Sequence, residues 1–381
     1  MSRRIVMIEG ARVDTDPRVG REAQALSAAG YEVVVLAWDR SGTDPAAEQR
    51  DGWRVESFGP AAGHGGGIRS VPGYRAFWRT AGARAALLEP AAIHCHDLDT
   101  VPAGLSALRA LGDRPKLVLD FWELYRESRA LPQAGVVGMI ARATARWLER
   151  RSIPRSDLLV TVVEGQVEYY RSLGARNVIV VENAPQLGEY HPTQRRDASE
   201  LVVCFIGQKR YAPALLSLME AIQPYPHLHA LLVGGGPAEA EIAAAATRFE
   251  RVTASGRVEK SAIPELYAGS DVVFACYDTA LLNWRTAFPV KVQEGMACGL
   301  PVIVSKGTWI AEYVAQHGLG FAVDDKDPAD VARALLALAE DREAARAMGA
   351  RGRALVESGL NWDAAVGRLV SAYDRLELID T

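Results

Sequence analysis

A lysine and a glutamate three positions apart form the chemically most suggestive pair in this sequence. They are Lys291 and Glu294, and they lie in segment 288–301, which opens with Phe-Pro-Val and closes with Cys-Gly-Leu-Pro. The pattern predicts a loop at Pro289, a short helix, a left-handed stop at Gly299 and then a buried strand. An ammonium group and free N–H groups at a helix start suit a phosphate, and a carboxylate suits a sugar diol. The segment therefore indicates a site for an anionic, hydroxylated ligand.

The same segment resembles the donor-site signature of retaining glycosyltransferases of family 4, in the variant Pro-x-Lys-x-x-Glu-x-Met-Ala-x-Gly-x-Pro. The matching residues are Pro289, Lys291, Glu294, Met296, Ala297, Gly299 and Pro301. The resemblance implies a GT-B fold, in which two Rossmann-like, doubly wound parallel sheets face each other across an interdomain cleft. The plainer alternative is a helix–strand unit whose lysine and glutamate are merely solvated.

Length and composition set the frame for this expectation. With 381 residues, of which 49% are hydrophobic, the chain can build two cores, because single cores rarely grow past roughly 250–300 residues. A net charge of −4 offers no basic field for nucleic acid. The four cysteines lack metal-site spacing, so we expect buried free thiols. Neither a signal peptide nor a membrane-spanning apolar run is recognisable, and we therefore expect a soluble, cytoplasmic protein.

Strand and helix patterns alternate along the chain and predict two α/β domains. We expect an acceptor-side domain at 1–185, a linker at 186–200 and a domain for the donor nucleotide sugar at 201–360. The resemblance implies that the terminal helix, 361–381, crosses back to the first domain. Segment 41–67 is rich in Gly, Pro, Asp and Ala, and we expect its glycine-rich stretch 63–67 to be mobile. The resemblance implies that this segment is variable and faces the acceptor, and a disordered linker is the alternative.

Polar residues at the carboxyl ends of the first-domain strands are candidates for ligand contacts. Asp16 and Arg18 belong to the first such loop and are predicted to bind the acceptor. Ordinary exposed loop charges would give the same pattern. His96 ends a later strand and is followed by Asp97, a further acceptor candidate. The resemblance implies that His96 contacts the donor sugar. His94 lies on the same side of that strand, but His94, His96 and Asp97 lack a convincing further ligand, so we expect no metal.

The next strand exit, Asp-Phe-Trp-Glu-Leu at 120–124, is similar to the family pattern Asp-x-His-Glu-Leu. Trp122 replaces the histidine of that pattern. A tryptophan can stack on a sugar face or a planar acceptor but cannot exchange a proton there. Trp122 and Glu123 are therefore predicted to contact the acceptor.

The second domain carries the expected donor contacts. Most relatives place an arginine directly after the first glycine of this domain and a lysine six positions after that glycine, but here Gln208 and Pro213 stand there. We therefore expect Lys291 and Arg210 to clamp the donor diphosphate and, with His96, to form the catalytic set. The other candidate donor contacts are Glu294, Lys209, Gly207, Arg257, Val258, Phe288, Val290 and Thr286. Thr286 stands eight residues before Glu294, where relatives often carry a second glutamate.

Arg142, Arg146 and Arg150 recur every four residues on a predicted helix. Such a basic amphipathic helix can lie on anionic lipid. A solvated helix face is the plainer interpretation.

The resemblance implies a retaining glycosyltransferase that needs neither metal nor cofactor. The expected donor is a UDP-sugar or GDP-sugar, and the expected acceptor is a small polar metabolite or a glycan precursor with a hydroxyl or other nucleophile. A nucleotide-sugar epimerase of the same fold is one alternative. A non-catalytic subunit that binds sugar nucleotides is another, suggested by the departures at Gln208, Pro213 and Thr286.

Overall fold

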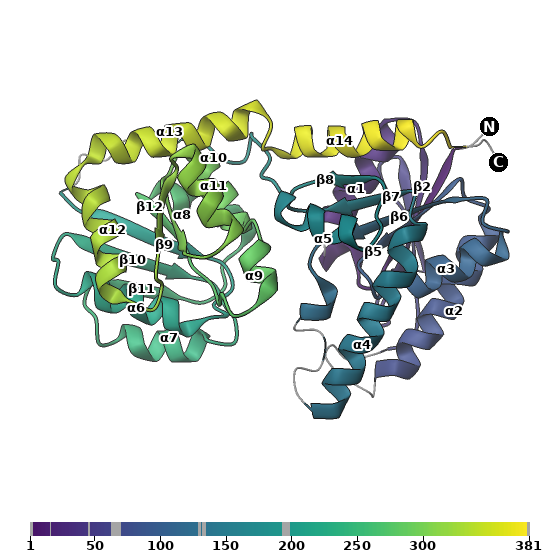
Figure 1. Cartoon of the computed structure of the whole chain (residues 1–381), viewed down its shortest axis with the longest axis horizontal. Coiled ribbons are helices and arrows are strands. Elements are labelled where there is room, and N and C mark those ends of the chain that lie inside the picture. Colours follow the sequence, from purple (N-terminus) through teal and green to yellow (C-terminus); the bar gives the residue numbers. More distant parts are fainter. Residues whose placement is uncertain are drawn as a thin grey trace. The chain divides into compact units, whose positions relative to one another are not determined.

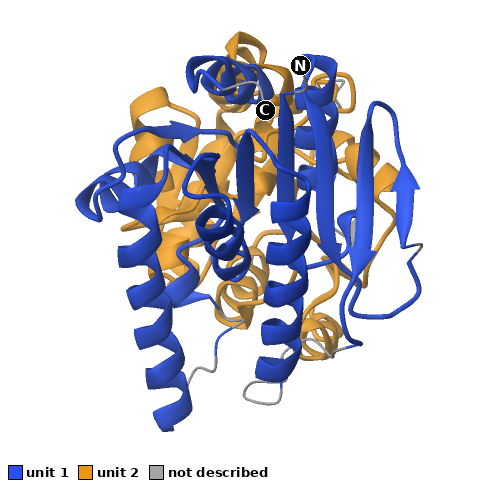
Figure 2. Cartoon of the chain, turned by 90° about the vertical axis from the view of Figure 1, so that its right-hand side faces the viewer, with its two compact units in different colours: residues 1–182, 365–381 blue, residues 183–364 orange. Residues whose placement is uncertain are grey.

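The computed structural model describes residues 3–15, 17–44, 46–61, 70–128, 131, 135–192 and 199–378. The chain divides into two compact units, one made of 1–182 with 365–381 and the other of 183–364 (Figure 2). Each unit is a largely parallel sheet with helices packed against both faces (Figure 1). Both units are therefore Rossmann-like, as the sequence predicted.

Unit 1 contains a sheet with the strand order β3-β4-β2-β1-β5-β6-β7-β8. The strands are β1 (Arg4–Glu9), β2 (Glu32–Trp38), β3 (Ala47–Gln49), β4 (Trp53–Phe58), β5 (Ala92–His96), β6 (Lys116–Phe121), β7 (Leu158–Thr161) and β8 (Val178–Val180). Every pair is parallel except β3 with β4. The order changes direction between β1 and β5, and ligands of open α/β sheets bind at such a switch point.

No strand was predicted within 41–67, but residues 47–49 and 53–58 form β3 and β4. Trp53 and Val55 are buried on one side of β4 while Arg54 between them is not. This alternation is typical of a strand, and the many nearby Gly, Pro and Asp residues obscured it. Residues 62–67 of the segment, which include the stretch 63–67 that was expected to be mobile, lie outside the described part of the chain.

The helices of unit 1 connect and cover these strands. They are α1 (Pro17–Ala28), α2 (Val71–Leu87), α3 (Val101–Ala110), α4 (Gly135–Ser152), α5 (Val167–Ser172) and most of α14 (Trp362–Arg375), with short 3₁₀ turns at Val13–Thr15, Tyr125–Glu127, Ile153–Arg155 and Glu164–Gln166. Strands β1, β2 and β5 are almost entirely buried. The core of unit 1 therefore holds the residues at the ends of these strands in fixed positions.

Unit 2 has the strand order β11-β10-β9-β12-β13-β14, and all pairs are parallel. The strands are β9 (Leu201–Ile206), β10 (Leu228–Val233), β11 (Val252–Ser255), β12 (Val272–Ala275), β13 (Val302–Ser305) and β14 (Gly320–Val323). The helices are α6 (Ala212–Ile222), α7 (Glu239–Ala246), α8 (Ile263–Ala268), α9 (Leu282–Thr286), α10 (Val290–Ala297), α11 (Trp309–His317), α12 (Pro328–Glu340) and α13 (Arg342–Ser358), with a 3₁₀ turn at Lys260–Ala262. This is the order of a dinucleotide-binding sheet, and its switch point lies between β9 and β12.

Within the described ranges, none of the helices combines the length and the apolar character that crossing a bilayer would require.

Candidate functional site

Lys291 lies on the first turn of α10 and points its ammonium group into unit 2. The side chain is buried, with 6% of the residue exposed. Its Nζ lies 3.1 Å from the centroid of the Phe205 ring and 5.1 Å from that of Tyr277. No residue in the described part of the chain accepts a hydrogen bond from this Nζ. Burial lowers the pKa of Lys291 to about 7.

The two aromatic contacts place Lys291 at the switch point of the unit 2 sheet. Phe205 belongs to β9, and Tyr277 follows β12 by two residues. The turn after β9 begins with Gly207, whose φ of +134° favours glycine. A Cβ at Gly207 would come within 3.4 Å of the Lys291 Nζ. A buried cation therefore sits beside a glycine turn, at the place where such sheets bind ligands.

Glu294 is held by two tyrosines from other parts of unit 2. Tyr190 and Tyr267 each donate a hydroxyl hydrogen bond of 2.8 Å, one to each oxygen of the Glu294 carboxylate. Burial, followed by the Glu294 charge, raises the pKa of Tyr267 well above its usual value, so this phenol remains a donor. The sequence had suggested that Glu294 belongs to the first turn of α10. In the structure Glu294 is the fifth residue of this helix and lies just beyond that turn. Gly299 has the predicted left-handed conformation, with φ of +72°.

The two cations of the turn after β9 have different environments. Lys209 is 1% exposed, and its Nζ donates a 2.5 Å hydrogen bond to the carbonyl oxygen of Ser255. The Lys209 ammonium thus joins the ends of β9 and β11, and its assignment to the donor stays a prediction. Arg210 is exposed, and its Nε donates to Oε1 of Gln208 at 2.7 Å.

The other predicted donor contacts surround α10 or lie beyond β11. The Thr286 hydroxyl donates to the carbonyl oxygen of Leu282 at 3.1 Å, so it caps its own helix. Phe288 packs between two aromatic rings of α11, and Val290 is 43% exposed. Arg257 is exposed and Val258 is partly buried.

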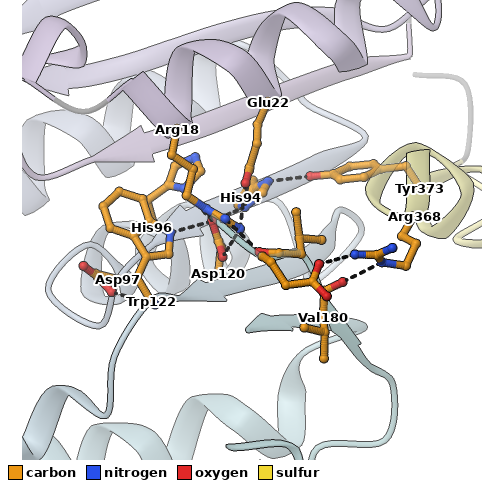
Figure 3. Close-up of polar contacts among 12 residues, drawn as sticks. Arg18, Glu22, His94, His96, Asp97, Asp120, Trp122, Val180, Arg368 and Tyr373 are labelled. Atoms are coloured by element: carbon orange, nitrogen blue, oxygen red, sulfur yellow. Dashed lines mark hydrogen bonds and ion pairs between the residues drawn. The ribbon is translucent and has the colours of Figure 1, made fainter. Parts of the chain in front are cut away.

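In unit 1, Arg18 is part of a buried charge network (Figure 3). Its guanidinium lies 3.2 Å from Oδ1 of Asp120 and 2.8 Å from Oε1 of Glu22. It also donates to the carbonyl oxygen of Val181 at 2.8 Å. Arg18 is only 3% exposed. Arg18 is therefore not the ordinary exposed loop charge of the alternative interpretation, and its predicted contact with an acceptor stays untested.

His94 and His96 stack on each other at the end of β5, with ring centroids 4.3 Å apart. Nδ1 of His96 lies 3.1 Å from Oδ2 of Asp120, and Nδ1 of His94 lies 2.8 Å from the hydroxyl of Tyr373 on α14. Burial, followed by the His94 charge, lowers the pKa of His96 to about 4. Although burial opposes ionisation of Asp120, Arg18 holds the pKa of its carboxyl well below the usual range.

These protonation states define what His96 can do. A neutral imidazole that donates from Nδ1 to an ionised Asp120 has a lone pair on Nε2. The Nε2 atoms of both His96 and His94 are buried, and neither has a hydrogen-bond partner among the described residues. His96 Nε2 can therefore accept a hydrogen bond from a ligand hydroxyl.

Four buried residues of this network could also hold a metal ion. One ligand atom from each of Glu22, His94, His96 and Asp120 lies within 4.8 Å of the others. The sequence pointed to His94, His96 and Asp97 as possible ligands. Glu22 and Asp120 could not be found in this way, because α1 and β6 bring them from distant parts of the chain. The guanidinium of Arg18 contacts both carboxylates and offsets one of their two negative charges.

Trp122 and Asp97 lie beside this network. The indole Nε1 of Trp122 donates to Oδ2 of Asp120 at 2.8 Å, and its backbone N–H donates to Oδ1 of Asp97 at 3.3 Å. The Trp122 ring is tilted against His96, with centroids 5.8 Å apart. Trp122 thus occupies the position next to His96 with its indole donor already used.

Three carboxylates gather around the exit of β5. Burial, followed by the charges of Asp99 and Glu123, raises the pKa of Asp97 well above its usual value. Asp97 also has a left-handed backbone, with φ of +56°. Its assignment and that of Glu123 to the acceptor stay predictions. Asp16 lies outside the described residues.

Several side chains that hold the site in place were not found from the sequence. Phe205 and Tyr277 flank the Lys291 ammonium, while Tyr190 and Tyr267 fix Glu294. Phe205 lies in a predicted strand, and Tyr277 follows another predicted strand by two residues. The assumption that both strands end at the same edge of the sheet would have placed the two side chains near each other. Tyr190 lies in the predicted linker, where no local pattern marks it.

Two protein-family models match most of the chain. Residues 15–184 match the family described as glycosyl transferase 4-like domain. Residues 188–355 match the family described as glycosyl transferases group 1. The boundary between the two matches lies close to the boundary between unit 1 and unit 2.

Two named glycosyltransferases are similar to this chain in sequence. The chain is 27% identical to a D-inositol 3-phosphate glycosyltransferase of Segniliparus rotundus over 248 residues, 59% of this chain and 54% of that protein. It is 30% identical to a GDP-mannose-dependent alpha-(1-6)-phosphatidylinositol monomannoside mannosyltransferase of Mycobacterium tuberculosis over 143 residues, 36% of this chain and 37% of that protein. The matches thus span about half and about a third of these relatives.

Two solved structures share the fold over nearly the whole chain. Sucrose-phosphate synthase from Thermosynechococcus elongatus has a TM-score of 0.77 at 19% identity, covering 98% of this chain and 99% of its own. The Anabaena protein HepE, in complex with UDP and glucose, has a TM-score of 0.69 at 16% identity, covering 97% and 99%. At these identities, both comparisons show a similarity of fold.

Proposed function

This chain belongs to the GT-B glycosyltransferases of the family 4 type, and from that premise we propose that it transfers a sugar from a nucleoside-diphosphate sugar to an acceptor nucleophile. The names of its relatives support this, since they are a D-inositol 3-phosphate glycosyltransferase and a GDP-mannose-dependent mannosyltransferase. The structurally similar HepE was crystallised with UDP and glucose. We propose a UDP-sugar or GDP-sugar as donor, and a small polar metabolite or glycan precursor as acceptor.

The observation that carries this proposal is the environment of Lys291. Burying an ammonium group without a hydrogen-bond partner is costly, and proteins rarely do so without a functional reason. Its Nζ is 3.1 Å from the Phe205 ring centroid and adjoins the glycine turn at the switch point of unit 2. A diphosphate there would gain a charge-assisted hydrogen bond from Lys291. Arg210 is exposed on the same turn and would supply a second cation.

We propose a retaining, same-face substitution. The bond from the anomeric carbon to the diphosphate oxygen breaks, and the acceptor oxygen forms its bond on the same face of the sugar. The acceptor's proton passes to the departing diphosphate. Lys291 and Arg210 stabilise the negative charge that develops on that leaving group, which is usually the largest catalytic contribution in such sites.

The remaining roles follow from side-chain chemistry. Glu294, oriented by Tyr190 and Tyr267, would accept hydrogen bonds from the ribose hydroxyls. The free lone pair of His96 Nε2 would accept one from the donor sugar. Trp122 and Glu123 would contact the acceptor. No metal enters this scheme, because the cationic side chains perform the neutralisation.

The direct test is product analysis with the full chain. It is incubated with UDP-, GDP-, ADP- and dTDP-sugars, with and without pooled polyol and glycan acceptors, while release of nucleoside diphosphate is followed. We expect release that one acceptor strongly accelerates, and NMR of the product should show that the anomeric configuration is retained. Conversion of the sugar nucleotide without acceptor would indicate an epimerase. Binding without turnover of any donor would indicate a non-catalytic subunit.

A further inference from the structure

Helix α4 of unit 1 exposes large apolar side chains. Val136, Met139, Ile140 and Trp147 are 65%, 61%, 59% and 61% exposed, and Val137 is also exposed. The face of α4 that packs on unit 1 carries instead Gly138, Ala145, Glu149 and Ser152. An ordinary surface helix buries its large apolar residues and exposes its polar ones. In α4 the large apolar side chains are exposed as well, and Figure 1 shows that one end of the helix projects beyond the strands.

Three of these residues and the exposed Ala143 form one continuous stripe. Val136, Ile140, Ala143 and Trp147 follow one another at spacings of four, three and four, which places them on a single helix face. At 100° per residue, this face lies opposite the buried Gly138. The stripe therefore points away from the core of unit 1.

Positive charges border the stripe on both sides. Helical geometry places Arg146 and Arg150 along one border and Arg151 along the other, and all three are exposed. The Arg151 guanidinium lies 5.9 Å from the centroid of the Trp147 ring. The acidic residue of α4, Glu149, is buried and accepts a 2.8 Å hydrogen bond from the Tyr169 hydroxyl. The solvent face of α4 thus combines an apolar centre with basic margins and no acidic side chain.

We propose that α4 docks unit 1 on an anionic lipid bilayer. The apolar stripe would enter the boundary between headgroups and acyl chains, and the arginines would contact lipid phosphates. Charge complementarity favours this occupant, because the whole chain has a net charge of −4 and concentrates basic residues beside this apolar stripe. The helix would lie in the plane of the membrane. The inference does not depend on the sugar-transfer reaction.

Vesicle flotation tests the proposal with the full chain. The protein is mixed with vesicles of phosphatidylcholine alone or of phosphatidylcholine with phosphatidylglycerol. We expect flotation with the phosphatidylglycerol vesicles only, and weaker binding as salt rises, because salt screens the arginine–phosphate attraction. Equal binding to both vesicle types, or none to either, would overturn the proposal.

Two variants separate the charges from the apolar stripe. In the triple variant Arg146→Gln, Arg150→Gln, Arg151→Gln, the partition coefficient should fall about 100-fold, at about five-fold per arginine near an anionic surface. The double variant Ile140→Ser, Trp147→Ser should also lose binding. The matched control removes three exposed arginines of unit 2 through Arg248→Gln, Arg333→Gln and Arg346→Gln, and should float like the wild type. Circular dichroism checks that every variant is folded.

A second copy of the chain is the competing occupant of this face. Light scattering without lipid distinguishes it. A dimer that Ile140→Ser, Trp147→Ser dissociates, together with vesicle binding that the α4 variants leave unchanged, would assign the stripe to self-association and overturn the lipid proposal. A monomer whose vesicle binding follows the α4 variants supports it. Sugar transfer to a soluble acceptor should be unchanged in all α4 variants, so failure of either proposal can be recognised separately.

Discussion

Single residues already show a conflict between stability and function in unit 2. Lys291 is a buried cation whose nearest described neighbours are aromatic rings, and burial lowers its pKa to about 7. An apolar side chain of similar length would fit such surroundings better. We therefore propose that Lys291 binds a ligand that carries negative charge, and two experiments follow from this.

Replacing Lys291 by methionine should stabilise the protein while weakening the donor site. We expect Lys291→Met to raise the free energy of unfolding at neutral pH by roughly 2 kcal/mol, because the cost of burying the amine disappears. The dissociation constant for the nucleoside diphosphate should rise at least ten-fold. Urea unfolding and calorimetric titration measure the two effects. Lys116→Met, at the amino end of β6 in unit 1, is the control and should leave nucleotide binding unchanged. A less stable Lys291→Met protein that binds nucleotide normally would contradict this account.

Binding of the diphosphate should take up protons between about pH 7 and pH 9. The Lys291 amine is largely neutral above its lowered pKa of about 7, and a bound anion favours the charged form and raises that pKa. Uptake should vanish near pH 5, where the amine is already protonated, and affinity should decrease as pH rises above 7. Titration at pH 8 in two buffers of different ionisation enthalpy measures the uptake. Uptake that persists unchanged in Lys291→Met would assign the proton to another group.

The sequence could identify residues that a motif or a strand end marks, but not the side chains that hold them. Lys291 and Glu294 stand in the signature of the resembling family, and His96 ends a strand. Tyr190 lies 104 positions from Glu294, and no local pattern predicts their contact. The burial of Arg18 was also unpredictable, since its partner Asp120 lies 102 positions away.

At the scale of elements, one buried network ties α1, β5, β6 and α14 together within unit 1. Asp120 on β6 contacts Arg18, His96 and Trp122, while Tyr373 on α14 contacts His94 (Figure 3). Nearby, Arg368 of α14 donates to the carbonyl oxygen of Val180 at 3.0 Å. These contacts explain why the last helix groups with the first unit.

Removing the central carboxylate should destabilise unit 1 strongly. Asp120→Asn leaves the Arg18 guanidinium buried beside a neutral amide, and breaking a buried ion pair costs about 3–5 kcal/mol. Because Arg18 keeps the pKa of Asp120 low, this stabilisation is present at neutral pH and should be lost as pH falls through that depressed pKa. Chemical unfolding at pH 7 measures the change. Asp157→Asn, whose partner Lys116 is partly exposed, should cost much less. Equal costs would show that the network does not support the fold.

Most elements could be predicted, because buried strands and amphipathic helices leave clear periodic patterns. The segment 201–206 is a short apolar run, and α10 ends at Ala297, two residues before the left-handed Gly299 that was predicted to stop it. Strands β3 and β4 were missed because they lie at a sheet edge among turn-forming residues. The exposed apolar stripe of α4 could be predicted only in part. The four-residue spacing indicated that the arginines share a helix face, but it did not indicate which face packs on unit 1.

At the scale of the whole molecule, we propose that unit 2 binds the nucleotide and that sugar transfer needs no added metal. We expect sugar transfer to be unaffected by EDTA, because Lys291 and Arg210 neutralise the diphosphate. Nucleoside diphosphate release with and without EDTA, followed by Mg²⁺, Mn²⁺ or Zn²⁺ addition, measures this. Loss of activity that Zn²⁺ restores would instead direct attention to Glu22, His94, His96 and Asp120.

The central claim is that the Lys291 amine binds the diphosphate of a nucleotide sugar. The most direct measurement compares the affinities of UDP and GDP with those of uridine and guanosine, in the wild type and in Lys291→Met. We predict that one diphosphate binds the wild type at least ten-fold more tightly than its nucleoside, and that Lys291→Met removes most of this difference. An unchanged difference in Lys291→Met would show that the diphosphate is bound elsewhere and would contradict the account.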